Sequence, residues 1–212
     1  MKNNSIEIKF DSVTLRFKER VGYILSIFEK LSFVVNKGER IGIFGPSGSG
    51  KTSLFFLILG LIRPSSGTIS ISSSIQLIPQ IPILDPWLTC EEILEISNLR
   101  KNANKEIHET LKDVGLYNQK NQLVTTLSGG EKQRLTVAAS LITGKKILLA
   151  DEPFGRLDLK STYKTRDFLL KIAEEKKLTL LLATHSTDHL ESLDRIFEIK
   201  NRSLLELNRN KH

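Results

Sequence analysis

The sequence predicts an α/β fold with a parallel sheet at its centre, and three observations lead to that prediction. A glycine-rich loop, GPSGSGKT at residues 45–52, lies between a short apolar run and a second, longer one. Two later runs, residues 147–150 and 178–183, are almost continuously apolar, as in strands that are buried on both faces. Helix-like segments separate these runs, and alternating strands and helices imply parallel pairing with right-handed crossovers.

The elements in the first part of the chain follow from its apolar spacing. In chain order, we expect strands at residues 6–17, 31–35 and 40–44, a helix at 53–59 and β structure over 68–78. Residues 6–17 alternate apolar and polar positions, which is typical of a half-buried strand. Pro64 and Gly67 end the helix, and Pro79 ends the β structure.

The segment at residues 81–127 differs from its surroundings, because Pro82 and Pro86 interrupt the chain and helical spacing follows them. This pattern predicts a small helical sub-domain that is set into a sheet-based core. The remaining expected elements are helices at residues 91–99, 105–116, 131–143 and 161–177, and a final hairpin with a short basic tail within 198–212.

The composition is that of a soluble globular protein, with 40% apolar and 26% charged residues. Cys90 is the only cysteine, so no disulfide can form within the chain and a reducing compartment is expected. The net charge is +7, but Lys and Arg alternate with Glu and Asp, which favours a solvated surface over a nucleic-acid groove. No signal peptide is visible, and the longest apolar run, residues 54–62, is too short for a bilayer. Any membrane role is therefore expected to come from a partner.

The glycine-rich loop fits the phosphate-binding pattern G-x-x-x-x-G-K-[ST] at every fixed position. The residues expected to hold a nucleotide are Gly45, Pro46, Ser47, Gly48, Ser49, Gly50, Lys51 and Thr52. Glycines let backbone N–H groups close around phosphate oxygens, and the following helix N-terminus adds partial positive charge. Lys51 can reach the β- and γ-phosphates of a triphosphate, and the Thr52 hydroxyl suits Mg²⁺. The alternative is a glycine-rich turn that happens to precede Lys-Thr, which the flanking strand and helix disfavour.

Two carboxylates end the apolar strand ILLADE at residues 147–152. Ligands bind at the carboxyl ends of parallel strands, so both side chains are expected beside the phosphates. Asp151 can hold Mg²⁺ through its water shell, and Glu152 can orient or polarise an attacking water. The alternative is that Asp-Glu-Pro merely ends the strand.

A second anion site is indicated by LSGGEKQ at residues 127–133. Ser128, Gly129 and Gly130 stand directly before a helical stretch, so a hydroxyl, exposed amides and a helix N-terminus come together. The alternative is a helix N-cap by Ser128 with a flexible glycine pair.

These motifs together resemble those of the ATP-binding subunits of ABC transporters, from about residue 6 to residue 207. By that resemblance, residues 128–133 are the signature motif, which completes the ATP site of a second subunit. Gln80 is similar to the glutamine that contacts Mg²⁺ and senses the membrane subunit. Asp158 falls in the D-loop, and His185 resembles the histidine that contacts the γ-phosphate.

The aromatic side chain that stacks on adenine in this family is expected at Phe17, with Tyr23 and Phe28 as alternatives. The resemblance implies one ABC ATPase domain, residues 1–212, with a P-loop NTPase parallel core and an N-terminal antiparallel β sub-domain. Residues 1–80 and 131–212 form the core, and residues 81–130 form the inserted helical sub-domain that ends in the signature motif.

The resemblance also implies partners and a location. Two copies in a head-to-tail dimer would enclose two ATP molecules with Mg²⁺, and separate membrane-spanning subunits would move the solute. The expected location is the cytoplasmic face of the cell membrane, and no nucleic-acid partner is expected.

Three short segments, at residues 85–89, 152–158 and 193–195, resemble importer subunits for nitrate, sulfonates and taurine. Arg156, Pro79 and Ser186 depart from that group, residues 123–126 lack its Tyr-Pro, and the segment between Gly67 and Gln80 is short. Lipoprotein-release and peptide-export subunits remain alternatives. A soluble ABC ATPase that acts on nucleic acid or the ribosome is a further one.

Overall fold

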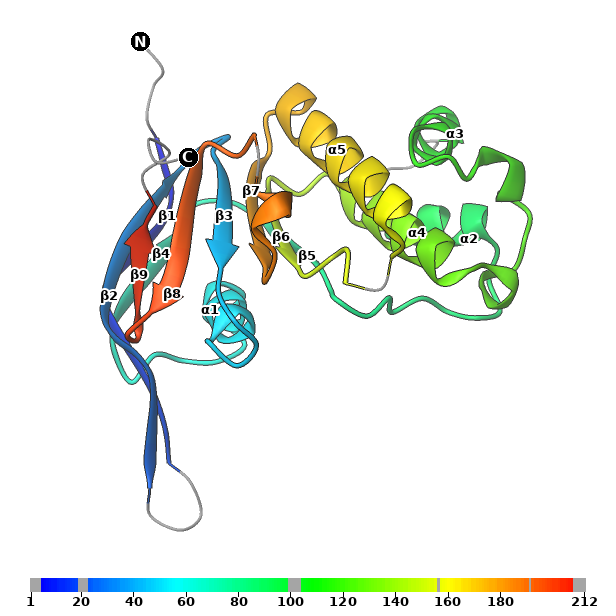
Figure 1. The fold of residues 1–212 in the computed structure, drawn as a ribbon. Coiled ribbons are helices and arrows are strands. Elements are labelled where there is room, and N and C mark those ends of the chain that lie inside the picture. Colours follow the sequence, from blue (N-terminus) through cyan, green and yellow to red (C-terminus); the bar gives the residue numbers. More distant parts are fainter. Residues whose placement is uncertain (1–4, 19–22, 99–103, 156, 191, 208–212) are drawn as a thin grey trace.

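Two sheets form the scaffold of the computed structural model, which describes residues 5–18, 23–98, 104–155, 157–190 and 192–207 (Figure 1). The antiparallel sheet has the order β2–β1–β4, with β1 Ile6–Lys18, β2 Ile24–Asn36 and β4 Ser66–Ile71. The second sheet has the order β5–β6–β7–β3–β8–β9, with β3 Arg40–Phe44, β5 Ile75–Ile78, β6 Ile147–Asp151, β7 Thr179–Thr184, β8 Arg195–Lys200 and β9 Ser203–Glu206. In this sheet, β5, β6, β7, β3 and β8 pair in parallel, and only β9 is antiparallel to its neighbour. The predicted α/β fold with a parallel core is therefore confirmed.

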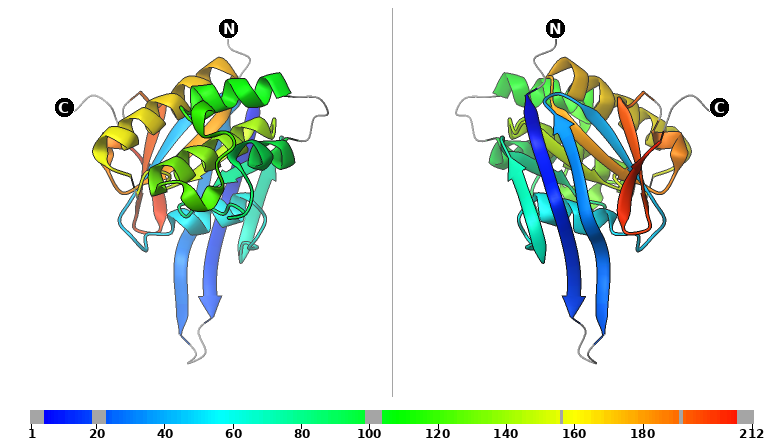
Figure 2. Two further views of the ribbon diagram at one scale, coloured as in Figure 1. Left: turned by 90° about the vertical axis from the view of Figure 1, so that its right-hand side faces the viewer. Right: turned by 90° about the vertical axis from the view of Figure 1, so that its left-hand side faces the viewer.

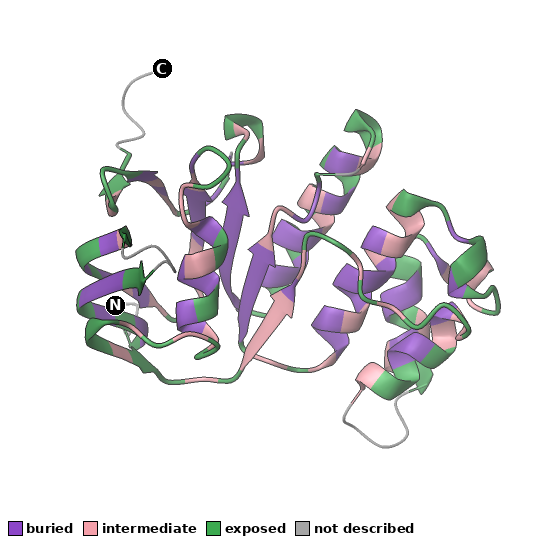
Figure 3. Ribbon diagram, turned by 90° about the horizontal axis from the view of Figure 1, so that it is seen from below, coloured by how far each residue is buried: buried purple, intermediate pink, exposed green. Residues whose placement is uncertain are grey.

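The central strands are buried on both faces, which explains why they lack polar alternation (Figure 3). Leu149 and Leu181 face the core that the parallel sheet shares with α1 and the antiparallel sheet. Leu148, Leu180 and Leu182 face the opposite core, against α4 and α5. The alternation of side chains along each strand thus supplies two separate hydrophobic layers.

The helices are α1 Lys51–Ile58, α2 Cys90–Ser97, α3 Asn104–Asp113, α4 Gly129–Ile142 and α5 Leu159–Glu175, with short 3-10 turns at Tyr117–Gln119, Val124–Thr126 and Thr187–His189. A third core joins α2, α3 and one side of α4, on the far side of α4 from the sheet (Figures 1 and 2). Because α4 belongs to two cores, the domain boundary at residues 130/131 stays a prediction. Among the described residues, no helix combines the length and apolar character that crossing a bilayer requires.

Several predicted elements differ from the observed ones. β2 begins at Ile24 rather than residue 31, because its pairing with β1 shifts register at several points and obscures the alternation. The β structure predicted over 68–78 is two strands in different sheets, since the chain leaves β4 and enters β5 between Ile71 and Ile75. Arg156, residue 99 of one predicted helix and the tail at 208–212 lie outside the described residues.

Candidate nucleotide-binding site

The glycine-rich loop connects the end of β3 to the start of α1, and its glycines are required by the backbone. Gly50 is the N-cap of α1 with φ +109°, in the left-handed region. A Cβ at Gly50 would lie 2.8 Å from Cγ2 of Ile27 and 3.1 Å from Cζ of Phe28. Only glycine therefore lets the loop pack against β2 at this position. The first N–H groups of α1 then point toward the space that the loop surrounds.

Lys51 lies inside the loop with only 5% of its surface exposed. Its Nζ donates to the carbonyl oxygens of Gly45 at 2.7 Å and Pro46 at 3.1 Å. The same ammonium group lies 3.1 Å from Oε1 of Glu152. The charge of Lys51 is thus held at the centre of the loop, where a phosphate chain would sit.

Thr52 and Asp151 bring two oxygen ligands together from different elements. The Thr52 hydroxyl, in the first turn of α1, donates to Oδ2 of Asp151 at 2.7 Å. Burial raises the pKa of Asp151, and the neighbouring Glu152 adds to this, while the Thr52 hydrogen bond and Lys51 oppose it. A hydroxyl beside a carboxylate is the hard-oxygen environment that Mg²⁺ prefers, so the residues present fit this ion.

Glu152 occupies a strained position directly after β6, with φ +44°. Its N–H donates to the carbonyl of Ala183 at 2.9 Å, which ties the turn to β7. Its Oε2 lies 3.0 Å from Nδ1 of His185 and 3.4 Å from Nε2 of Gln80. Burial alone would raise the pKa of this carboxyl, but Lys51 and His185 outweigh it, so the pKa lies below the ordinary glutamate value.

A cavity of about 280 Å³ unites these groups. It is lined by Ile27, Ser47, Gly48, Gly50, Lys51, Thr52, Ser53, Gln80, Asp151 and Glu152. Three separated sequence motifs thus line one cavity, and His185 from a fourth contacts Glu152. Ile27 was missed, because an apolar residue within a strand carries no sequence signal for ligand contact. Within the described chain, the buried Ser49 Oγ has no hydrogen-bond partner, so the loop retains an unused polar atom.

The signature residues and Asp158 do not line this cavity. Ser128 is the N-cap of α4 in a capping box: its hydroxyl accepts from the Glu131 N–H and donates to Oε2 of that residue at 2.7 Å. Asp158 caps α5 by accepting from the N–H of Ser161. The capping alternative thus describes their present hydrogen bonds, and a role in another subunit's site stays a prediction.

The predicted adenine-stacking residues lie on the hairpin of β1 and β2. Phe17 is 40% exposed but does not line the cavity, and Tyr23 is exposed directly before β2. Phe28 is fully buried beneath Gly50, so its ring face is not available to a base and this alternative is wrong.

Comparisons with known proteins show the family of the chain. The family model described as ABC transporter matches residues 28–155. The lipoprotein-releasing system ATP-binding protein LolD of Rickettsia conorii is 34% identical over 198 residues, covering 85% of this chain and 90% of that protein. The aliphatic sulfonates import ATP-binding protein SsuB 2 of Pseudomonas syringae pv. tomato is 35% identical over 164 residues, covering 77% and 71%.

A solved structure with a similar fold is a dimeric ATP-binding cassette in a post-hydrolysis state, bound to ADP and Pi. It superposes with a TM-score of 0.84 at 27% identity and covers 97% of this chain and 100% of its own. The residues matched by the family model include the loop at 45–52, the strand that ends in Asp151, and Glu152 directly after it. This chain therefore belongs to the ABC transporter family, as an ATP-binding domain of that family.

Proposed function

We propose that this chain hydrolyses Mg²⁺-ATP and thereby drives transport through separate membrane-spanning subunits. The observation that carries the proposal is that Lys51, Gln80, Asp151 and Glu152 line one cavity. His185 contacts Glu152 at its edge. Each of these side chains supplies a group that phosphoryl transfer requires.

The hydrolytic roles follow from the contacts. Lys51 moves from Glu152 to the β- and γ-phosphates, where it offsets negative charge and frees the carboxylate. Glu152 then orients the attacking water, and His185 lies close enough to reach the γ-phosphate side of the site. Thr52, Asp151 and Gln80 would hold Mg²⁺, which neutralises charge that develops on the phosphates during transfer.

A second copy of the chain completes the site. Ser128 is an exposed residue at the N-terminus of α4, outside the cavity. In a head-to-tail dimer the Ser128 segment of each copy faces the phosphates held by the other, and the Ser128 O–H turns from Glu131 to an oxygen of ATP. The dimeric state of related cassettes supports this arrangement.

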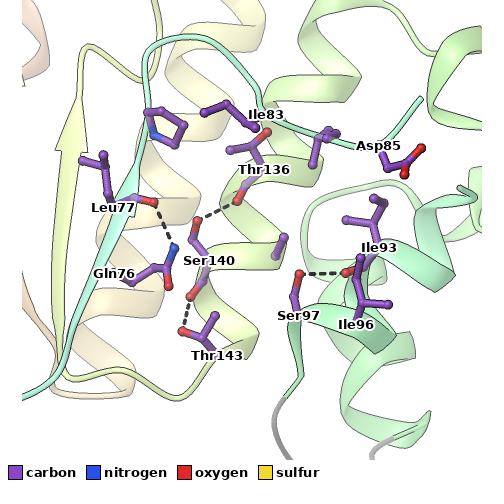
Figure 4. A pocket seen from close by; sticks show the side chains of 13 residues that line it. Gln76, Leu77, Ile83, Asp85, Ile93, Ile96, Ser97, Thr136, Ser140 and Thr143 are labelled. Carbon is purple, nitrogen blue, oxygen red and sulfur yellow. Dashed lines mark hydrogen bonds between the residues drawn. The ribbon is translucent and has the colours of Figure 1, made fainter. Parts of the chain in front are cut away.

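A membrane subunit has a place to bind beside the Gln80 segment. A cavity of about 460 Å³ lies between that segment, α2 and α4 (Figure 4). Ile83 and Ile96 at its edge are exposed by 83% and 66%, which is unusual for large apolar side chains. Gln133 Nε2 of α4 reaches the carbonyl of Pro79 at 3.5 Å, so movement of α4 can be passed to Gln80.

The solute is proposed from short sequence segments and from the names of relatives. Residues 85–89 and 152–158 favour import of a small anion such as a sulfonate, and relatives named for sulfonate import support this. Relatives named for lipoprotein release support the alternative equally. Co-purification of the membrane subunit, followed by transport of labelled sulfonate or release of lipoprotein from proteoliposomes, separates the two.

The decisive experiment uses Glu152→Gln, which keeps the size of the side chain and removes its charge. We expect this variant to bind Mg²⁺-ATP, to lose hydrolysis by more than a hundredfold, and to shift from monomer to dimer in size-exclusion light scattering only with ATP. Hydrolysis at the wild-type rate would refute the role of Glu152. A nucleic-acid pull-down with the wild-type chain tests the soluble-ATPase alternative.

A further inference from the structure

His189 lies between the two loops that carry Glu152 and His185. It ends the short turn Thr187–His189, three residues beyond Ser186. Its ring is half-buried and faces β7 on one side and the segment after β6 on the other. The sequence gives no sign of this position, because a histidine in an exposed-looking turn carries no motif.

On the first side, His189 fixes the backbone that carries His185. Its Nδ1 lies 3.1 Å from Oγ1 of Thr184, a residue that is only 2% exposed. The same Oγ1 accepts a hydrogen bond from the N–H of Ser186 at 3.1 Å. The hydroxyl thus joins residues on either side of His185, and His189 sets the direction of that hydroxyl.

On the second side, His189 packs against the segment that follows Glu152. The rings of His189 and Phe154 meet edge to face, with centroids 5.1 Å apart and planes at 77°. Phe154 is 3% exposed and belongs to the core between the sheet and α5. Phe154 lies two residues after Glu152. Because the backbone at Glu152 is strained, the direction of the Glu152 side chain depends on how the following segment is packed.

We propose that His189 is a positioning residue for the Glu152–His185 pair; this inference rests on the proposed ATP hydrolysis. The Thr184 hydrogen bond fixes one member of the pair, and the Phe154 contact fixes the segment of the other. The 3.0 Å contact between Glu152 and His185 is therefore held from outside the cavity, by a residue that does not line it.

The electrostatic surroundings are consistent with a neutral imidazole. Burial lowers the pKa of His189 below its ordinary value, Arg166 and His185 lower it further, and Asp188 opposes them. Arg166, from α5, also donates to the carbonyl of Asp188 at 2.8 Å, which anchors the turn from the side of α5. A neutral ring can accept a hydrogen bond from the Thr184 hydroxyl at Nδ1 without adding charge beside His185.

The test compares three variants by steady-state ATP hydrolysis. His189→Leu keeps an apolar contact with Phe154 but removes the hydrogen bond, and Thr184→Val removes the hydroxyl. Each should lower kcat roughly tenfold, the loss expected for one hydrogen bond at a catalytic arrangement, while KM for ATP stays unchanged. His189→Asn places an amide near the position of Nδ1 and should restore most of kcat.

The double variant Thr184→Val/His189→Leu should be no slower than either single variant, because both remove the same interaction. His108→Leu is the matched control: this histidine bonds Glu91 in the helical region, and its loss should leave kcat unchanged. The inference is overturned if His189→Leu keeps wild-type kcat, if His189→Asn is as slow as His189→Leu, or if the two single effects multiply.

Failure of the proposed function gives a different result. In that case the wild-type chain does not hydrolyse ATP, or Glu152→Gln hydrolyses it at the wild-type rate, and the inference about His189 falls with it. Thermal midpoints of all variants identify losses that come from unfolding. The rescue by His189→Asn then separates a positioning role from simple destabilisation.

Discussion

Nδ1 of His185 lies 3.0 Å from Oε2 of Glu152, although the two residues are separated along the chain by the whole of α5. They meet because β6 and β7 are parallel neighbours whose carboxyl ends lie side by side. The other carboxylate oxygen, Oε1, is held by Lys51 at 3.1 Å. Before nucleotide arrives, Glu152 is thus fixed between the phosphate-binding lysine and the histidine after β7.

The pKa of Glu152 should rise in a Lys51→Met variant. Burial of this carboxyl raises its pKa, and Lys51 is the main group that opposes burial, so removing Lys51 leaves burial dominant. The carboxyl resonance of Glu152, assigned with Glu152→Gln, should titrate below the pKa of an unperturbed glutamate, about 4.3, in the wild type and at higher pH in the variant.

Lys146→Met serves as the control, since Lys146 is exposed and remote from the cavity. The lowered pKa of Glu152 also sets how the stability of the fold depends on pH. A carboxyl with a lowered folded-state pKa stabilises the fold above its unfolded pKa, and that contribution is lost as the pH falls through the folded pKa. An unchanged titration midpoint in Lys51→Met would contradict the ion pair.

Ser128→Arg should block ATP-induced dimerisation and leave nucleotide binding by the monomer intact. The helix N-terminus that would face the partner's phosphates is then covered by a bulky side chain. Thr89→Arg is a matched control, because Thr89 caps α2 with the same capping box, through Glu92. Each variant should lose about 1 kcal/mol of stability through its cap, whereas only Ser128→Arg should prevent the dimer.

Light scattering in the Glu152→Gln background measures this difference. If the Ser128→Arg chain dimerises with ATP as readily as Thr89→Arg, residues 128–130 do not act on a second subunit.

The fold was predictable wherever burial leaves a clear pattern in the sequence. Strands at 147–150 and 178–183 were found because both faces are covered, so nearly every position is apolar. The residues at 68–78 show why other parts were not: the sequence there is uniformly β-like, and which sheet each half joins depends on partners far along the chain.

The site divides in the same way. Lys51, Asp151 and Glu152 were predictable because phosphate and Mg²⁺ chemistry restrict the residue types at fixed spacing. The contacts of Thr184 and Phe154 with His189 depend on packing between two loops, and packing leaves no pattern in the chain. The residues that would contact phosphate and Mg²⁺ are therefore predictable from the sequence, whereas the residues that orient them are not.

Cys90 should be unreactive in the folded protein. Its side chain is fully buried at the start of α2, and burial raises the pKa of the thiol to about 11. Because the thiolate is the reactive form, a disulfide reagent at pH 8 should label Cys90 slowly in the native state and fully in urea. Rapid labelling of the native chain would mean that the helical region opens readily at this point.

Asp151→Asn should leave the nucleotide-free protein at least as stable as the wild type. Burial raises the pKa of Asp151 and the charge of Glu152 adds to this, so ionising this carboxyl costs more free energy in the folded than in the unfolded state. Replacing it removes that cost while the amide can still accept from Thr52. The thermal midpoint without nucleotide should therefore stay constant or rise.

The same substitution should abolish the extra stabilisation that Mg²⁺ gives in the presence of ATP. An amide oxygen is a weaker ligand for Mg²⁺ than a carboxylate, so the midpoint with Mg²⁺-ATP should approach that with ATP and EDTA. Asp113→Asn, at the exposed end of α3, is the control and should respond to Mg²⁺ like the wild type. A normal Mg²⁺ response in Asp151→Asn would show that Asp151 does not bind the ion. A lower midpoint without nucleotide would show that this carboxylate stabilises the fold.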